Sequence, residues 1–446
     1  MTMPYSALTP SALLLPLLAA NLVACGDDGA ADPTTTTSPD DTSSSTAAPT
    51  TGDEPTGGDT DTTTSQPGTT TADPTTDPTT TLSSTSDPST STGTSDPDTT
   101  TAPDTDTDTG EGWQPPACDM VTGTGAVTFS HDQGATLAPM DQQIVPVTYT
   151  FGLVALGKPG FMLAGSGQQI LASTDAGCSW HSIGAAGDGN SPAVRLVAAG
   201  DTRAYGFGDN NSIVVRVDDE VVTTLKAPGA PDGIVGLGVD PDDPDHVRVG
   251  DASGQLWDST DAGVVWNPLG TLPDGVIAYR VAFDPRDIDH VAVGSLAAGV
   301  QSSFDGGAEW HKATGLGSGE ANGFNLVVSP ADGDIVWVEG LDLEDPDDAT
   351  SRHIWRSEDG GLTFAAVVDS ADATLYNGNH LFAHPTDPDV LYFVFGSNFQ
   401  GHGTDLYRYD HADAGITMTH NKWHDTVITF LPGDPGWIYL GLSIEP

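Results

Sequence analysis

The sequence predicts an all-β fold, a seven-bladed β-propeller, over residues 113–446, and three observations lead to this prediction. An octapeptide with Ser first, Asp third, Gly fifth and usually Trp eighth starts at residues 130, 173, 259, 303 and 357. The step from 130 to 173 is 43 residues, and the step from 173 to 259 is 86, which is twice as long. Short β-rich runs flanking Pro- or Asp-containing turns alternate with the octapeptide. A fixed period of this length indicates a repeated unit, and two hairpins per repeat make a four-stranded blade.

Every position of the octapeptide has a structural role in a tight turn between two strands. The Ser hydroxyl and the Asp carboxylate can hydrogen-bond to the backbone of the turn. The Gly permits a positive φ, and the closing aromatic ring fills the space beneath the hairpin. We therefore predict structural rather than catalytic roles for these residues. They are Ser130, Asp132, Gly134, Ser173, Asp175, Gly177, Trp180, Ser259, Asp261, Gly263, Trp266, Ser303, Asp305, Gly307, Trp310, Ser357, Asp359, Gly361 and Phe364.

The spacing also locates the blades that lack a good octapeptide. The double step predicts a blade whose hairpin lies near 212–219, and a degenerate copy follows at 406–411. The last repeat, 424–446, has room for two strands only, whereas the first octapeptide has no inner strands before it. We predict that the hairpin near 124–137 completes the blade begun by 424–446. This pairing closes the ring and removes open sheet edges.

The Ser-x-Asp-x-Gly-x-x-Trp pattern resembles the Asp box of the BNR-repeat, sialidase-like β-propellers. The resemblance covers about residues 118–446 and implies the propeller fold. It also implies that ligands bind on the face opposite the boxes, over the central channel. A sialidase of this group needs three arginines that grip a carboxylate. This chain lacks the family's Arg-Ile-Pro motif and shows no recognisable arginine triad, so sialidase activity is not expected.

The face opposite the boxes receives the second turn of each blade and the links between blades. Two of these turns are enlarged, one by residues 341–348 and one by residues 396–405. Extra loops on a rigid scaffold often carry binding functions, although plain solvated loops are the alternative. The candidate ligand-binding residues are Asp209, Asn210, Asp251, Asp342, Glu344, Asp345, His380, Asn398, His402, Asp405, Trp423 and His424.

Calcium is the one cofactor for which the sequence offers ligands. Asp345, Asp347 and Asp348 supply clustered carboxylate oxygens, but the spacing of an EF-hand is absent. A glycosidase would need only two carboxylates at a suitable separation. Acidic residues are so numerous here that the sequence singles out no pair, and the catalytic residues stay unassigned.

Residues 1–25 contain a short apolar run that ends in Leu22-Val23-Ala24-Cys25. This segment resembles a bacterial lipoprotein signal with Cys25 as the lipidated residue, and it is too short and interrupted for a transmembrane helix. No Lys or Arg precedes Lys158, so the usual basic region is missing, and an ordinary secretory signal is the alternative. The resemblance implies an extracytoplasmic protein anchored through Cys25 to a bacterial membrane, at the outer membrane or the cell surface.

Residues 26–112 consist largely of Thr, Ser, Pro, Asp and Gly, with 18 acidic and no basic residues. Such a composition cannot form a core, so we predict a disordered, extended stalk. The other 45 acidic residues and all 13 basic residues give the rest of the chain a net charge of about −32. This charge disfavours nucleic acid as a partner.

Cys118 and Cys178 are the two cysteines that remain beside Cys25. In an exported protein such a pair predicts a disulfide, with two free thiols as the alternative. Together these features favour a surface-anchored, non-catalytic module that binds a glycan or a protein at the propeller face. A glycoside hydrolase of the sialidase-like propeller group is the alternative.

Overall fold

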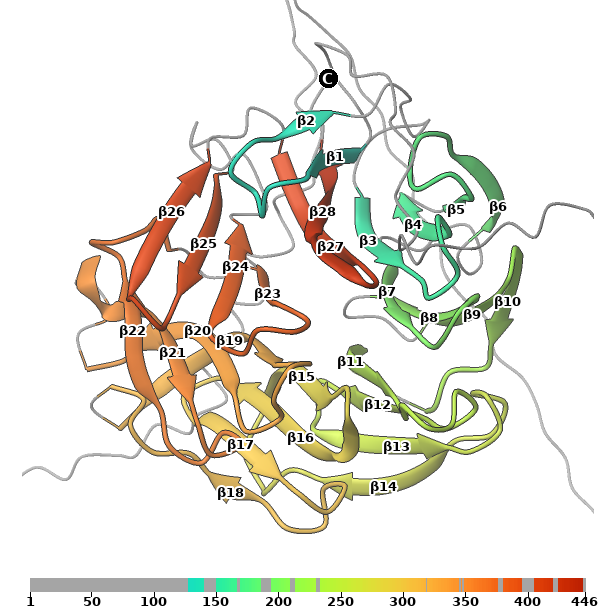
Figure 1. The fold of residues 1–446 in the computed structure, drawn as a ribbon. Coiled ribbons are helices and arrows are strands. Elements are labelled where there is room, and N and C mark those ends of the chain that lie inside the picture. Colours follow the sequence, from blue (N-terminus) through green and yellow to red (C-terminus); the bar gives the residue numbers. More distant parts are fainter. Residues whose placement is uncertain are drawn as a thin grey trace, which may run out of the picture. The chain divides into compact units, whose positions relative to one another are not determined.

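The computed structural model describes residues 127–139, 150–166, 169–185, 194–208, 213–229, 233–317, 319–344, 346, 349–375, 380–394, 405–419 and 424–443. The predicted signal, the predicted lipidation site Cys25 and the predicted stalk lie outside the described residues. Within them, the strands pair into seven antiparallel sheets of four strands each, as the octapeptide spacing predicts (Figure 1).

The sheets are numbered here as blades, each given from its innermost to its outermost strand. Blade 1 is β27 (His424–Leu431), β28 (Asp434–Ser443), β1 (Val127–Ser130) and β2 (Ala138–Pro139). Blade 2 is β3 (Thr150–Ala155), β4 (Met162–Ser166), β5 (Gln169–Ser173) and β6 (His181–Ala185). Blade 3 is β7 (Val194–Ala198), β8 (Arg203–Gly208), β9 (Val214–Asp218) and β10 (Val221–Leu225). Blade 4 is β11 (Ile234–Val239), β12 (Val247–Asp251), β13 (Gln255–Ser259) and β14 (Asn267–Thr271).

Blade 5 is β15 (Ala278–Asp284), β16 (Asp287–Ser295), β17 (Gly299–Ser303) and β18 (His311–Lys312). Blade 6 is β19 (Ala321–Val328), β20 (Val336–Asp342), β21 (Arg352–Ser357) and β22 (Ala365–Asp369), with a short 3₁₀ turn, η2 (Ala349–Ser351), before β21. Blade 7 is β23 (His380–Ala383), β24 (Val390–Val394), β25 (Leu406–Asp410) and β26 (Gly415–Thr419).

The innermost strands form a closed ring. Each contacts the innermost strand of the next blade, and β23 contacts β27 at the end of the circuit. Close approach between neighbouring blades requires glycine at some positions. A Cβ at Gly236 of β11 would lie 2.0 Å from the carbonyl oxygen of Val281 in β15. The core therefore lies between the blades, as where Val336 and Trp355 of blade 6 pack with Ala292 and Val300 of blade 5.

Blade 1 is built from both ends of the described chain, which confirms the predicted closure. Strand β1 pairs antiparallel with β28, from Val127 opposite Gly441 to Ser130 opposite Ile438. Phe129 is buried in a cluster with Tyr439, and Trp437 packs against it. Figure 1 shows β1 and β2, in teal, beside β28 and β27, in red, although these segments are far apart in the sequence.

The five octapeptides that start at residues 130, 173, 259, 303 and 357 are called boxes below. They share one hydrogen-bonding geometry between the third and fourth strands of their blades. The Ser hydroxyl donates to the Asp carboxylate at 2.7–2.9 Å. The Gly N–H donates to the Ser oxygen at 2.7–2.9 Å. The N–H four residues beyond each Asp donates to its carboxylate at 2.8–2.9 Å. These contacts explain why the pattern repeats.

Blade 3 lacks a box but keeps its backbone conformation. Asp219 has a φ of 51°, close to the 60° of Ala262 in the box of blade 4. The N–H of Asp219 bonds to Thr202 in the first turn of its blade, as that of Ala262 bonds to Asp245. The prediction that a blade without a box lies near 212–219 is thus confirmed.

Candidate functional site

The direction of the strands sorts the loops onto two faces. The first and third turns of each blade, which include the boxes, share the box face. The second turns and the links between blades share the link face. Six predicted candidates belong to described residues on the link face: Asp251, Asp342, Glu344, His380, Asp405 and His424. The others, with the predicted calcium ligands, lie outside the described residues: Asp209, Asn210, Asp345, Asp347, Asp348, Asn398, His402 and Trp423.

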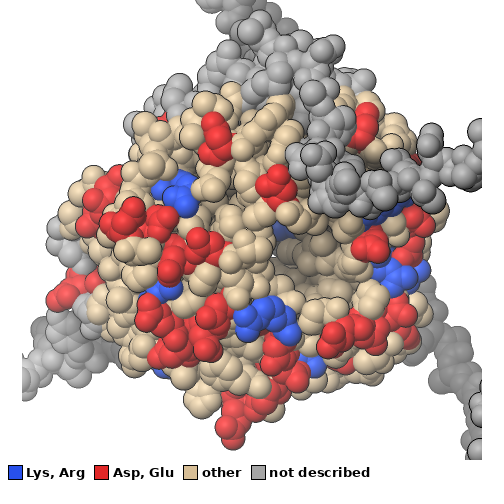
Figure 2. All heavy atoms as spheres, viewed as in Figure 1, with Lys and Arg blue, Asp and Glu red and all other residues tan. Residues whose placement is uncertain are grey.

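One candidate, His380, contacts an arginine that the sequence analysis did not select. Nη1 of Arg195 lies 3.5 Å from Nδ1 of His380. Arg195 is the second residue of β7, and His380 is the first of β23. Blades 3 and 7 lie on opposite sides of the ring, so this contact spans the central channel near the link face. Figure 2 shows one face of the propeller, with a hollow near its centre surrounded by more acidic than basic side chains.

Two aromatic residues stand on neighbouring inner strands, β15 and β19. Tyr279 of β15 and Phe324 of β19 form an edge-to-face pair with ring centroids 5.3 Å apart. Phe324 is 5% exposed, so its ring belongs to the packing between blades 5 and 6 rather than to an open channel surface. The sequence signal that could have identified Arg195 is a polar residue near the start of the first strand of a repeat.

The carboxylate of Asp251 is occupied by its own turn. Oδ1 accepts hydrogen bonds from the N–H and hydroxyl of Ser253, at 3.0 and 2.5 Å, and from the N–H of Gln255 at 3.1 Å. Oδ2 accepts one from Nε1 of Trp257 at 3.2 Å. Asp251 is also almost fully buried. It therefore stabilises a turn, as the box carboxylates do.

Asp342 likewise serves its loop, because its Oδ1 accepts the N–H of Glu344 at 3.0 Å. A glycosidase acid needs a carboxyl group whose pKa is raised. Wherever the pKa of a described carboxyl group departs from its ordinary value, it is lowered. These groups lie on the box face and are Asp132, Asp175, Asp240, Asp258, Asp261, Asp305 and Asp359.

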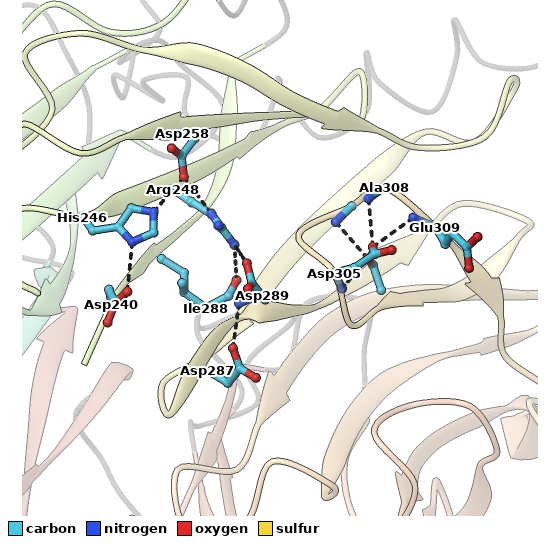
Figure 3. A network of polar contacts seen from close by, with 12 residues as sticks. Asp240, His246, Arg248, Asp258, Asp287, Ile288, Asp289, Asp305, Ala308 and Glu309 are labelled. Carbon is cyan, nitrogen blue, oxygen red and sulfur yellow. Dashed lines mark hydrogen bonds and ion pairs between the residues drawn. The ribbon is translucent and has the colours of Figure 1, made fainter. Parts of the chain in front are cut away.

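A polar network on the box face joins blade 4 to blade 5 (Figure 3). His246 contacts Asp240 through Nδ1 at 2.9 Å and Asp258 through Nε2 at 2.8 Å. Burial lowers the pKa of His246, but hydrogen bonds to Asp258 and Asp240 outweigh it, so the pKa is raised. Arg248 donates to Asp258 at 2.8 Å and to Asp289 of blade 5 at 2.6 Å.

A buried His–carboxylate pair in blade 5 has a similar linking role. Nδ1 of His290 lies 3.3 Å from Asp284, and Nε2 lies 3.0 Å from the carbonyl oxygen of Gly360 in blade 6. Phe304 stacks on the imidazole with centroids 4.7 Å apart. Both ring nitrogens are thus engaged, so His290 is not placed to act as a general base.

A comparison with curated proteins identifies the family. The dispase autolysis-inducing protein of Streptomyces mobaraensis is 48% identical over 343 residues, which cover 74% of this chain and 90% of that protein. The chain belongs to this protein's family. No protein-family model matches the sequence.

Two solved structures to which this chain is similar are GH74 enzymes. The GH74 xyloglucanase of Xanthomonas campestris shows 14% identity and a TM-score of 0.49, with 68% of this chain covered. An ancestral GH74 enzyme shows 13% identity and a TM-score of 0.48, with 72% covered. This chain spans 54% and 46% of those two chains. At this level of similarity, no conclusion about function follows.

The described part of this family member holds no group of three His, Cys, Asp or Glu side chains that could bind a metal ion. Nor does any helix among the described residues have the length and apolar character to span a membrane. Cys178 is disulfide-bonded. Its predicted partner, Cys118, lies outside the described residues.

Proposed function

We propose that this chain is a non-catalytic, protein-binding propeller whose partner is a protease, and that binding promotes self-digestion of that protease. The observation that carries the proposal is the 48% identity to a protein named for inducing the autolysis of dispase. Autolysis is the cleavage of a protease by its own activity. An inducer therefore needs to change the protease rather than to cleave a bond itself.

A rigid ring can do this by population shift. If the propeller binds one conformer of a protease more tightly than another, the favoured conformer becomes more populated. A favoured conformer with more exposed loops is cut faster by neighbouring protease molecules. The size of the effect is limited by the difference in affinity between the two conformers.

The enzymatic alternative receives less support from the described residues. The carboxyl groups with a shifted pKa hold turns and join blades, as Asp261 and Asp258 do. Asp251 of the link face is used by its own turn. The channel mouth around Arg195 and His380 has the character of a binding surface rather than of a carboxylate pair.

The test is an incubation of dispase with the full-length chain. Intact dispase, followed by gel electrophoresis and by cleavage of a small peptide substrate, should disappear faster as the chain is added and level off near an equimolar ratio. Heat-unfolded chain is the control. An unchanged decay of dispase would contradict the proposal, and turnover of fluorogenic glycosides by the chain would favour the glycosidase alternative.

We also propose that lipid on Cys25 and the stalk of residues 26–112 hold the propeller outside a bacterial membrane. The support is the Leu22-Val23-Ala24-Cys25 segment and the composition of the stalk, which has 18 acidic and no basic residues. Labelled palmitate should enter the wild-type chain in cells and be absent from Cys25→Ala. Equal labelling of both would refute the anchor.

A further inference from the structure

Large apolar side chains are exposed on one stretch of the box face. Val264 is 59% exposed, Val265 54%, Leu269 41% and Phe304 45%. Val264 and Val265 belong to the box of blade 4, Leu269 to the β14 strand that follows it, and Phe304 to the box of blade 5. We call these four residues the box-face patch.

A contact between blades 4 and 5 connects the two hairpins that carry the box-face patch. A Cβ at Gly306 would lie 3.4 Å from Cδ2 of Leu269, so Leu269 reaches the box that contains Phe304. Val264 and Val265 lie on the same hairpin as Leu269. The patch thus occupies neighbouring hairpins of blades 4 and 5, with the Phe304 ring on the side toward blade 6.

Phe304 is held in place rather than free to rotate. One side of its ring stacks on His290, with an angle of 11° between the ring planes. A Cβ at Gly360 would lie 2.6 Å from Cε1 of the ring, so blade 6 confines its edge. An aromatic side chain fixed in advance loses little conformational entropy on binding and is a frequent interface anchor.

The fold does not require apolar residues at these positions. The position of Val265 holds Thr136, Ser179 or Thr363 in three other boxes, and each of those hydroxyls donates to its box Asp at 2.5–2.8 Å. Val265 lacks this hydrogen bond. The position of Phe304 holds His131, Thr174, Thr260 and Glu358 in the other boxes. Turn geometry does not explain the apolar residue at 265, and binding does; Phe304 in addition packs on His290.

Exposed carboxylates border the patch. Asp261, Asp305 and Glu309 of the two boxes are exposed. Asp245 and Asp289 are 54% and 55% exposed as well, but they are paired with Arg203 and Arg248. The carbonyl oxygens of Asp245 and Asp289 accept the N–H of Ala262 and of Gly306, within the two boxes that carry the patch. A matching surface would therefore have an apolar centre and a rim of Lys and Arg.

We infer that the box-face patch is the docking surface for the protease of the proposed function, on which this inference rests. The partner surface is an apolar area of the protease with a basic rim. Docking on the box face leaves the channel mouth on the link face open.

The test uses residues that sister boxes already carry. In the variant Val265→Thr with Phe304→Thr, the hydroxyl at 265 can donate to Asp261, whereas the change at 304 removes the stacking on His290. The thermal midpoint is therefore measured for the double variant and for Val265→Thr alone, which should melt as wild type and also bind more weakly. Binding of the double variant to dispase, measured by calorimetry with the full-length chain, should weaken on the order of tenfold or more. Met418→Thr on β26, which replaces an equally exposed apolar residue far along the chain, is the control and should bind as wild type.

The outcomes separate the two proposals. Binding and accelerated autolysis by wild type, with the double variant within twofold of it, would overturn the docking surface and leave the proposed function standing. Absence of both effects in wild type would overturn both. Wild-type affinity that does not fall as salt rises would overturn the basic rim.

Discussion

At the scale of single residues, the serine of each box has a larger role than its size suggests. Ser259 is fully buried, accepts the N–H of Gly263 at 2.9 Å and donates to Asp261 at 2.9 Å. Its hydroxyl thereby couples the carboxylate to the turn that the carboxylate orders. The sequence pattern reported this role correctly because all the partners lie within a few residues.

Ser259→Ala should lower the free energy of unfolding by about 1–3 kcal/mol, since it leaves a buried N–H without its acceptor. Urea unfolding of the full-length chain measures the change. Thr260→Ala, one residue away and exposed, should change it by less than about 0.5 kcal/mol. Equal effects of the two substitutions would contradict the role assigned to the serine.

The boxes also predict the response to acid. Burial raises the pKa of Asp175 and Asp359, but hydrogen bonds from Ser179 and Thr363 outweigh it, so both lie below 3.8. A carboxyl group whose pKa is lowered by folding stabilises the protein above its unfolded pKa, and the stabilisation is lost as pH falls through the folded pKa.

The thermal midpoint should therefore drop as the pH falls below about 3.8, the value of the unfolded carboxyl group. Calorimetry from pH 6 to pH 2 measures it. Asp175→Asn should flatten the drop, because one of the titrating groups is gone. The same pH dependence in both proteins would argue against this origin.

At the scale of elements, arginines join successive blades on the box face. Arg203 contacts Asp245 of blade 4, Arg248 contacts Asp289 of blade 5, and Arg356 contacts Asp389 of blade 7. Each arginine leaves the second or third strand of one blade and reaches the first turn of the next. These contacts supplement the apolar packing between blades.

The arginines should differ in their contribution according to burial. Arg248, whose side chain is 8% exposed, also holds Asp258, so Arg248→Ala should cost about 1.5–3 kcal/mol. Arg286 is 51% exposed and lies 4.0 Å from Asp332, so Arg286→Ala should cost about 0–1 kcal/mol. Urea unfolding compares them, and the reverse order would show that burial does not govern these pairs.

At the scale of the whole molecule, blade 1 decides whether the ring is closed. Its two inner strands come from the C-terminal end and its two outer strands from residues 127–139. Without β1, strand β28 would become an open edge, and the cluster around Tyr439 would lose Phe129.

Deletion of residues 113–137 should therefore remove the cooperative melting transition or lower its midpoint by well over ten degrees, since an open ring loses packing at the blade 1 and blade 7 contacts. Circular dichroism melting measures this. As a control, Thr260→Ala should melt as wild type. A deletion variant with an unchanged melting curve would contradict closure by this segment.

Much of this architecture could be predicted from the sequence by itself. The box residues, the blade without a box near 212–219 and the split blade follow from spacing and from contacts within one turn, and such contacts depend on local geometry. The role of Asp251 was missed because its partners, Ser253, Gln255 and Trp257, form no repeated pattern.

Only the tertiary structure showed what distant segments do together. Arg195 and His380 are 185 residues apart, and they meet because ring closure sets blades 3 and 7 across one channel. The exposure of Val265 and Phe304 likewise depends on how blades 4 and 5 pack, which composition does not reveal. Local hydrogen bonds are encoded by neighbours in the chain, whereas surfaces arise from the whole closed ring.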